Sequence, residues 1–467
     1  MLSYFPQKIA NKGVALYVVS LVLVSLLFIN YVIPWYFMVI GLVEVSVFFL
    51  LTNSFSKGWQ LIQPAKLFEK KVFWGALFVR LIWVVFSYYF FIHQTGIPFE
   101  YDTADALGYH EEAKWLANQN WRKVIDYLFL GRAGYSDSGY SFYLTVLYKV
   151  IGPNIFVVRV LKAFLSAYMC VLLYRLSSRT LGEAVARMAS VFCAFMPNLF
   201  IYCGMHLKET EMLFLTVAFL ERADYVLRNN KVKVWDVVIP LLLCLSLFLF
   251  RTALGAVAAL SFLTALLFNS TRVTSRARKL RVALWSVLAL SILGGSTIAN
   301  EVESLIQNRE ANQEMRRYEQ TIRGNQWAKY ATGAVMAPMV FVLPFTTMVD
   351  TGQYGQLVLH GGNFVRNFMG VFVLIGLFSA FFTKKNWRNL SLVGSFTIGY
   401  LFVVSLSGFA SSERFLLPGL PGLLIIAAYG IYELTSKSYK WVKIWYVVLV
   451  MMQLGWAYFK VGSRGLL

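Results

Sequence analysis

Residues 14–32 read VALYVVSLVLVSLLFINYV, an apolar stretch without a charged side chain. A helix needs about 20 such residues to cross the hydrocarbon core of a bilayer. The stretch is too long, and has the wrong flanks, for a cleaved signal peptide. Because its apolar residues are continuous rather than alternating, it predicts a membrane-spanning helix and not a barrel strand.

Similar stretches follow along the whole chain of 467 residues, of which 58% are hydrophobic and 14% charged. A soluble domain carries roughly 25% charged residues. We therefore expect an all-α polytopic membrane protein with about 13 transmembrane helices. The predicted spans are residues 14–32, 34–52, 72–93, 155–174, 188–204, 210–227, 235–250, 252–269, 282–299, 363–383, 389–408, 413–433 and 441–459.

The net charge of +20 is distributed as a topology signal. Basic side chains are retained on the cytoplasmic side of short loops. With the N-terminus inside, one face receives Lys8, Lys12, Lys57, Lys66, Lys70, Lys71, Arg175, Arg179, Arg187, Arg228, Lys231, Lys233, Arg272, Arg276, Arg278, Lys279, Arg281, Lys384, Lys385, Arg388, Lys437, Lys440 and Lys443. This pattern predicts a multi-pass membrane protein with its C-terminus outside. We expect the membrane to be a bacterial-type inner (plasma) membrane. No basic patch with interleaved aromatics is present, so no nucleic-acid partner is expected.

Two apolar segments are too short or too interrupted to span. Ser141–Ile151 contains Lys149 and is expected to lie on the periplasmic surface as a juxtamembrane helix. Met336–Val349 is broken by two prolines and is expected to be re-entrant. Residues 300–330 have the charge pattern of a solvated helix. The four cysteines lie in or beside apolar segments without a C-x-x-C pair, which indicates packing rather than a metal site.

The first long outer loop, residues 94–154, carries the acidic residues Asp102, Asp105, Glu111 and Glu112. Asp105, Tyr109 and Glu112 share one helix face by their spacing. A carboxylate there can accept a proton from an attacking hydroxyl. The alternative is that Asp102 or Asp105 simply caps a juxtamembrane helix.

A second polar group occurs where one span ends and the next begins, in Gly204-Met-His-Leu-Lys-Glu-Thr-Glu211. Glu209 and Glu211 would occupy the first helical turn, where acidic groups are favoured by the helix dipole alone. His206 and Lys208 add a titratable and a positive group at the same depth. Ionisable groups clustered at a membrane end are candidates for function.

Three arginines stand at or near the ends of apolar spans: Arg251, Arg366 and Arg414. A guanidinium in this position can clamp a phosphate, or it can extend to the lipid headgroups. Arg414 would open a helix, where its charge opposes the dipole. We therefore expect an anionic group, either Glu413 or a ligand phosphate, to offset it.

These residues fall into an ordered series of motifs. The loop reads Asp105-Ala-Leu-Gly-Tyr109-His-Glu-Glu-Ala113. Later stretches are Gly139-Tyr140 through Leu147-Tyr-Lys-Val-Ile-Gly152, Arg159-Val-Leu, Leu181-Gly182, Lys208-Glu209-Thr210 and Arg414-Phe-Leu-Leu-Pro418. In order and spacing, residues 72–270 and 363–435 resemble the integral-membrane glycosyltransferases of the C-type (GT-C) fold. They are similar to the polyprenyl-phosphate-sugar group that includes protein O-mannosyltransferases and lipid A aminoarabinose transferases.

The resemblance implies a site and a division of the chain. Asp105 would be the general base, with Glu209 and Asp102 as further acidic residues. Lys208, Arg251 and Arg414 would hold the lipid phosphate, and His206, Tyr109, Glu112 and Arg366 would line the site. Residues 1–71 would be two additional helices, 72–299 the catalytic module, 300–362 a periplasmic segment and 363–467 the C-terminal helices. These extra helices, and the lack of a large C-terminal outer domain, depart from the named groups and leave the acceptor open.

The resemblance further implies an inverting transfer from a polyprenyl-phosphate-linked sugar to a lipid, glycan or protein at the periplasmic face. No cofactor is expected; a divalent cation between Asp102 and Asp105 is the alternative. Two other functions stay open. A polymerase or ligase would move a lipid-diphosphate-linked oligosaccharide on the same fold. A transporter or flippase would show inverted repeats and broken helices near the midplane, and neither occurs in the sequence pattern.

Overall fold

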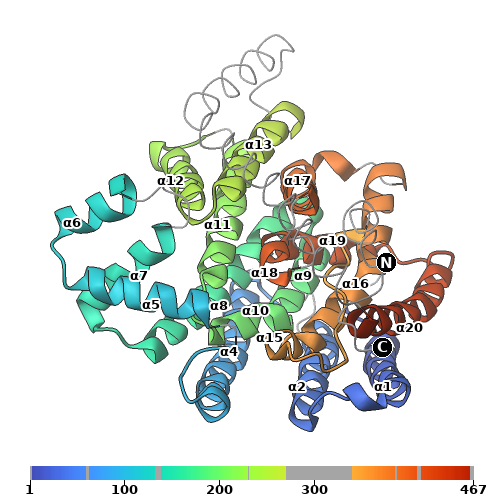
Figure 1. The fold of residues 1–467 in the computed structure, drawn as a ribbon. Coiled ribbons are helices and arrows are strands. Elements are labelled where there is room, and N and C mark those ends of the chain that lie inside the picture. The colour runs from blue at the N-terminus through green and yellow to red at the C-terminus, as the bar shows by residue number, and fades with distance from the viewer. Residues whose placement is uncertain are drawn as a thin grey trace.

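The computed structural model describes residues 3–58, 63–101, 103–131, 138–229, 231–269, 339–383, 386–406 and 412–462. These residues form helices joined by turns and irregular connections, without a strand (Figure 1). Seven helical segments are long and apolar enough to cross a membrane: Gln7–Leu27, Trp35–Gly58, Ala65–Thr95, Ile155–Leu181, His360–Thr383, Glu413–Tyr432 and Tyr439–Gly462. Each coincides with a predicted span, which supports a helical, polytopic membrane protein.

Five further predicted spans also fall on helices. Residues 188–204 become Glu183–Phe195 (α9) and Pro197–Gly204, bent by 52° at the break. Residues 210–227 become Glu209–Arg228 (α11), which carries several charged side chains. The other three are apolar but shorter: Val234–Phe250 (α12), Thr252–Asn269 (α13) and Ser391–Leu406 (α17). The predicted span 282–299 and the predicted solvated helix 300–330 lie outside the described residues.

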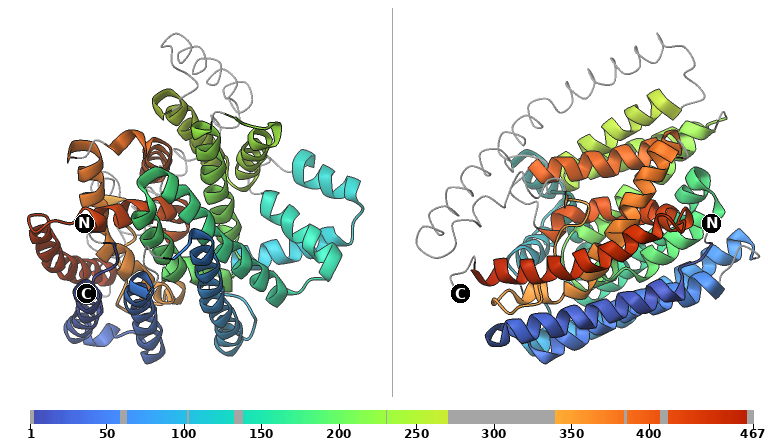
Figure 2. Two further views of the ribbon diagram at one scale, coloured as in Figure 1. Left: turned by 180° about the vertical axis from the view of Figure 1, so that it is seen from behind. Right: turned by 90° about the vertical axis from the view of Figure 1, so that its right-hand side faces the viewer.

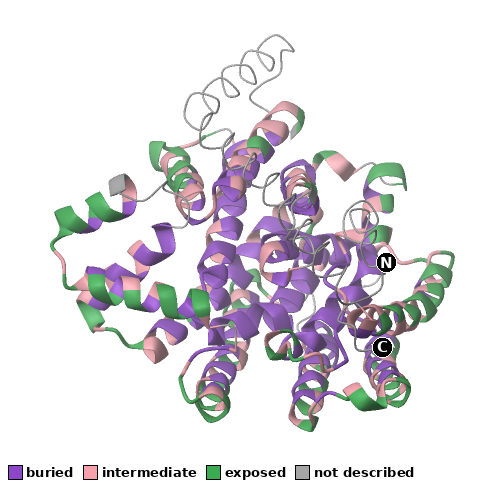
Figure 3. Ribbon diagram, in the orientation of Figure 1, coloured by how far each residue is buried: buried purple, intermediate pink, exposed green. Residues whose placement is uncertain are grey.

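The core of the molecule is formed by helices buried on most sides, chiefly α8 (Ile155–Leu181), α9, α11, α16 (His360–Phe378) and α19 (Leu420–Tyr432) (Figure 3). α16 and α19 touch backbone to backbone. A Cβ at Gly376 would collide with the Ile426 carbonyl oxygen, and one at Gly430 would collide with that of Phe372. Small residues allow this close approach of membrane helices.

The first two helices pack against the C-terminal part of the chain rather than standing apart. α1 (Gln7–Leu27) and α2 (Trp35–Ser46) lie beside α16 and α20 (Tyr439–Gly462) (Figures 1 and 2). The Tyr17 hydroxyl lies 2.8 Å from Nε2 of His360. The Gly362 N–H donates to Oε2 of Glu44 at 2.9 Å. α1 begins and α20 ends at opposite ends of the bundle (Figure 2).

A lateral group of three helices follows α4 (Ala65–Thr95): α5 (Ala104–Ala117), α6 (Trp121–Ile125) and α7 (Ser138–Ile151), at the left of Figure 1. The segment Ser141–Ile151 is therefore helical, as predicted. The predicted boundary at residue 71 falls inside α4.

The described part of the predicted re-entrant segment, residues 339–349, contains no helix longer than a turn. It is buried against α16, where the Asn367 amide donates to the carbonyl oxygens of Val342 and Pro344 at 2.7 and 2.9 Å. An irregular backbone at this depth needs such protein partners for its polar groups.

Candidate functional site

Arg414 joins two carboxylates that are far apart in the sequence. It lies in the short helix α18 (Glu413–Leu416). Its Nη1 donates to Oδ2 of Asp105, on α5, at 2.7 Å. Its Nε donates to Oε1 of Glu209, the first residue of α11, at 2.9 Å. The fold therefore brings together three of the predicted site residues from three helices.

The group runs from the interior to the surface. The Glu209 side chain is fully buried, that of Arg414 is 28% exposed and that of Asp105 is 55% exposed. Among the described residues, Oδ1 of Asp105 and Nη2 of Arg414 have no hydrogen-bond partner. An open carboxylate oxygen and an open guanidinium edge therefore lie side by side.

Two more predicted cations lie beside Arg414. The Lys208 ammonium donates to the carbonyl oxygen of Phe250 at 3.3 Å. Phe250 directly precedes Arg251 in the chain. The Arg251 guanidinium stands 4.3 Å from the ring centroid of Phe415 and donates to the Tyr400 hydroxyl at 3.0 Å. We call Asp105, Lys208, Glu209, Arg251 and Arg414 the Arg414 cluster. It holds three cations and two carboxylates, an excess of positive charge that suits a phosphate.

Two of the alternatives left open by the sequence do not hold in this region. Glu413 does not offset Arg414; its Oε1 accepts from the Asn198 amide instead, while Asp105 and Glu209 bind the guanidinium. Asp105 is not a helix cap, because α5 begins at Ala104 and Asp105 is its second residue. Asp102 lies outside the described residues.

Tyr109 and Glu112 lie on the same helix as Asp105 but contact a different element. The Tyr109 ring stands edge-on to Tyr140 of α7 at 5.1 Å. Glu112 accepts a hydrogen bond from the Ser141 hydroxyl, also on α7. These two residues hold α5 against α7, whereas Asp105 bonds to Arg414.

His206 belongs to a buried chain of hydrogen bonds. The Tyr148 hydroxyl lies 3.2 Å from its Nε2 and 2.7 Å from Nδ1 of His110. The backbone N–H of His206 donates to Oε2 of Glu100 at 3.2 Å. Burial lowers the pKa of His206 well below its usual value, and the positive charge of Lys162 lowers it further. His206 is therefore neutral at physiological pH.

The interior beneath this chain contains cations that were not predicted as site residues. The Lys162 ammonium lies 3.5 Å from Oε2 of Glu211 and donates to the carbonyl oxygens of Met205 and Leu207. Arg159 lies 3.8 Å from Glu100, whose pKa is raised by burial against the opposing effect of this arginine. These cations could have been found from the sequence, because Arg159 and Lys162 are two basic residues three positions apart in an apolar helix.

Arg366, also predicted near the site, is not part of the Arg414 cluster. It is buried in α16, at 3% exposure, close enough to Glu413 for their charges to interact. Asn198 of α10 (Pro197–Ile201) and Glu44 of α2 lie in the same region and were missed. Glu44 could have been found from the sequence, because a carboxylate within an otherwise apolar span is a candidate functional residue.

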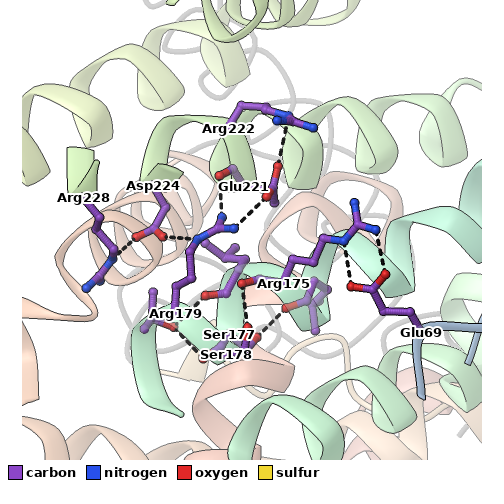
Figure 4. A network of polar contacts seen from close by, with 12 residues as sticks. Glu69, Arg175, Ser177, Ser178, Arg179, Glu221, Arg222, Asp224 and Arg228 are labelled. Carbon is purple, nitrogen blue, oxygen red and sulfur yellow. Dashed lines mark hydrogen bonds and ion pairs between the residues drawn. The ribbon is translucent and has the colours of Figure 1, made fainter. Parts of the chain in front are cut away.

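A different charge network occupies the other end of α11 (Figure 4). Arg179 donates to Glu221 at 2.9 Å and to Asp224 at 3.0 Å. Asp224 also accepts from Arg228 at 2.7 Å, and Arg222 lies 3.2 Å from Glu221. Beside it, Arg175 and Glu69 make a two-pronged pair at 2.7 and 2.8 Å. Each carboxylate in this network has a guanidinium partner.

No group of three or more His, Cys, Asp or Glu side chains arranged to hold a metal ion occurs among the described residues, which do not include Asp102. Comparison with known proteins adds no further identification: no family model matches the chain, and no curated protein matches it either.

Proposed function

We propose that the chain is a membrane glycosyltransferase that transfers a sugar from a polyprenyl-phosphate-linked donor to a lipid, glycan or protein acceptor. The observation that carries this proposal is the Arg414 bridge between Asp105 and Glu209. It places a carboxylate and a guanidinium, each with an unused atom, beside Lys208 and Arg251.

In the proposed reaction the acceptor hydroxyl attacks the anomeric carbon, and the bond from that carbon to the phosphate oxygen breaks. Oδ1 of Asp105 takes the hydroxyl proton, and polyprenyl phosphate leaves with the bonding electrons. A single displacement inverts the anomeric centre. Arg414, Lys208 and Arg251 stabilise the charge that develops on the leaving phosphate. Glu209 fixes the orientation of Arg414.

We further propose about 13 spans in a bacterial inner membrane, with the Arg414 cluster at the periplasmic face. Two observations support this orientation. The basic residues of the short loops favour one side, and α1 and α20 have their outer termini at opposite ends of the bundle, as an odd number of crossings requires (Figure 2).

The proposal is tested by sugar transfer with purified protein in lipid nanodiscs. A panel of polyprenyl-phosphate and polyprenyl-diphosphate donors with a labelled sugar is offered together with a membrane lipid extract as acceptor source. We expect donor consumption by the wild type and about a 10²- to 10⁴-fold lower rate for Asp105→Asn, the usual contribution of a general base.

The matched control is Glu111→Gln on the same helix, since Glu111 is exposed and pairs only with Lys114 at 3.6 Å among the described residues. It should leave transfer unchanged. Consumption of diphosphate-linked oligosaccharides alone would support the polymerase or ligase reaction instead. Absence of transfer with every donor, or full activity of a folded Asp105→Asn variant, would refute the proposal.

A further inference from the structure

A second polar cluster lies buried beside the Arg414 cluster. It consists of Glu44 on α2, Asn198 on α10, Asn363 and Arg366 on α16, and Glu413 on α18, and we call it the Arg366 cluster. Asn198 donates to Oδ1 of Asn363 at 3.0 Å and to Oε1 of Glu413. The five side chains belong to residues that are between 0% and 8% exposed. Glu413, the most exposed, directly precedes Arg414 in the chain.

Within the part of the chain that the structure describes, the Arg366 guanidinium has no hydrogen-bond partner. None of its three nitrogens makes a hydrogen bond, and no carboxylate among the described residues comes within 4.0 Å of them. Acceptor atoms in the cluster are unused as well: Oε2 of Glu413, Oε1 of Glu44 and Oδ1 of Asn198. Unpaired polar groups are costly in a protein interior, so this arrangement points to a group that binds between them.

A second buried arginine differs from Arg366 in its hydrogen bonds. Arg80 on α4 is fully buried, like Arg366. Its guanidinium donates to the Ser166 hydroxyl at 2.8 Å and to the carbonyl oxygens of Ala194 and Cys193 at 2.8 and 3.1 Å. Arg80 therefore has its partners within the fold, whereas those of Arg366 are missing.

The composition of the cluster indicates what kind of group it accepts. It holds two carboxyl groups, two amides and a single guanidinium, a mixture of donors and acceptors rather than the several cations that bind a phosphate. Hydroxyl groups fit better, because each can donate to a carboxylate or amide oxygen and accept from a guanidinium. A sugar ring presents several such hydroxyls, and convergent polar groups of this kind fix the orientation of a ligand.

We propose that the Arg366 cluster binds the hydroxyl groups of the donor's sugar ring and thereby sets sugar specificity. This inference rests on the proposed function, in which the Arg414 cluster holds the phosphate of the same donor. The adjacency of Glu413 and Arg414 places the two clusters next to each other, as the sugar and phosphate are in the donor. Glu44, from the N-terminal pair of helices, contributes to this part of the site.

Two ligands separate sugar recognition from phosphate recognition. One is the donor that the wild type consumes, measured by its KM; the other is the same polyprenyl phosphate without a sugar, measured as a competitive inhibitor. We expect Arg366→Met to raise the KM of the donor about tenfold or more, the effect of losing hydrogen bonds to a charged group. The inhibition constant of the sugar-free lipid should stay unchanged. Lys208→Met should weaken both ligands, since both carry the phosphate.

Thermal melting of Arg366→Met provides a second readout. Removal of an unpartnered buried charge should leave the melting temperature of the ligand-free protein unchanged or raise it. A lower melting temperature, or an equal loss of affinity for the sugar-bearing and sugar-free lipids, would overturn this inference while leaving the proposed function intact. Absence of transfer by the wild type would instead overturn the proposed function, and the inference with it.

Discussion

The two ends of α11 use charged side chains in different ways. At its C-terminal end, Glu221 and Asp224 are bound by arginines from α8 and from α11 itself (Figure 4). At its N-terminal end, Glu209 shares Arg414 with Asp105, and the neighbouring Arg366 has no hydrogen-bond partner among the described residues. The ends lie about 18 Å apart between Glu209 and Glu221, at roughly 1.5 Å per residue of helix.

The contrast distinguishes charges that hold helices together from charges that are available to a ligand. In the Arg179 network each carboxylate pairs with a guanidinium, and Arg179 connects α8 to α11 through Glu221 and Asp224. Oε2 of Glu221 makes no hydrogen bond, but it lies 3.2 Å from the Arg222 guanidinium. In the Arg414 and Arg366 clusters, donors and acceptors are left over. Buried groups without partners mark places where a ligand completes the structure.

Substitution of Arg414 should have the largest effect. Arg414→Gln removes the cation that binds both Asp105 and Glu209, and we expect transfer to fall about 10²- to 10³-fold, as for the loss of one transition-state donor. Arg414→Lys should recover part of the rate, since a single ammonium cannot reproduce the guanidinium's two directed bonds. The measurement is kcat/KM, with a melting curve to verify folding. A wild-type transfer rate for Arg414→Gln would mean that the charges at the N-terminal end of α11 do not serve transfer, which would contradict the contrast between the two ends of this helix.

Substitution of Arg179 should affect stability instead. Its side chain is 27% exposed and pairs with two nearly buried carboxylates, so we expect Arg179→Gln to lower the free energy of unfolding by about 1–3 kcal/mol, less than for a fully buried pair. Arg175→Gln should cost about 1 kcal/mol or less, because its pair with Glu69 is more exposed. Denaturant unfolding in detergent measures both. Loss of transfer per folded molecule in either variant would show that this network also serves the reaction.

The buried histidine predicts a smaller, pH-dependent effect. Because the pKa of His206 is lowered in the folded protein, the unfolded chain takes up a proton near pH 6.5 that the folded protein does not. Stability should therefore fall as the pH drops below 6.5, by up to about 1.4 kcal/mol per pH unit. The raised pKa of Glu100 has the opposite effect on stability at lower pH. The contribution of His206 is therefore read from the difference between the wild type and a His206 variant, since both contain Glu100.

The measurement is the melting temperature of the wild type and His206→Gln between pH 8 and pH 5. The variant should lose less stability on acidification than the wild type. Parallel curves would mean that His206 is protonated in the folded state, and the interior beneath the Arg414 cluster would then be more polar than its burial indicates.

The sequence predicts the membrane class and most helices because both depend on local composition. Continuous apolar runs locate the seven membrane-length helices, and the position of Glu209 in the first turn of α11 follows from the adjacent apolar pattern. The grouping of Asp105, Glu209 and Arg414 was expected from the order of family motifs rather than from periodicity. Contacts across 205 and 309 residues are not contained in any local pattern.

The Arg366 cluster could not be predicted for the same reason. Glu44 meets the N–H of Gly362, which is 318 residues away, and Asn198 meets Glu413 across 215 residues. Helix periodicity indicates which face is apolar, but not which helices become neighbours. Either Glu413 or a ligand phosphate was expected to offset Arg414. The Glu413 and Arg414 side chains bind different partners, because successive residues of a helix point in different directions.

The most direct test of this account compares two substitutions on one helix, Glu209→Gln and Glu221→Gln. Transfer rate and melting temperature are measured for both. We predict that Glu209→Gln lowers transfer per folded molecule about 10²-fold, since Gln keeps the shape but loses the charge that orients Arg414. Glu221→Gln should lower the melting temperature and leave transfer per folded molecule unchanged. The reverse result, with Glu209→Gln fully active and only less stable, would contradict the assignment of function to the Arg414 end.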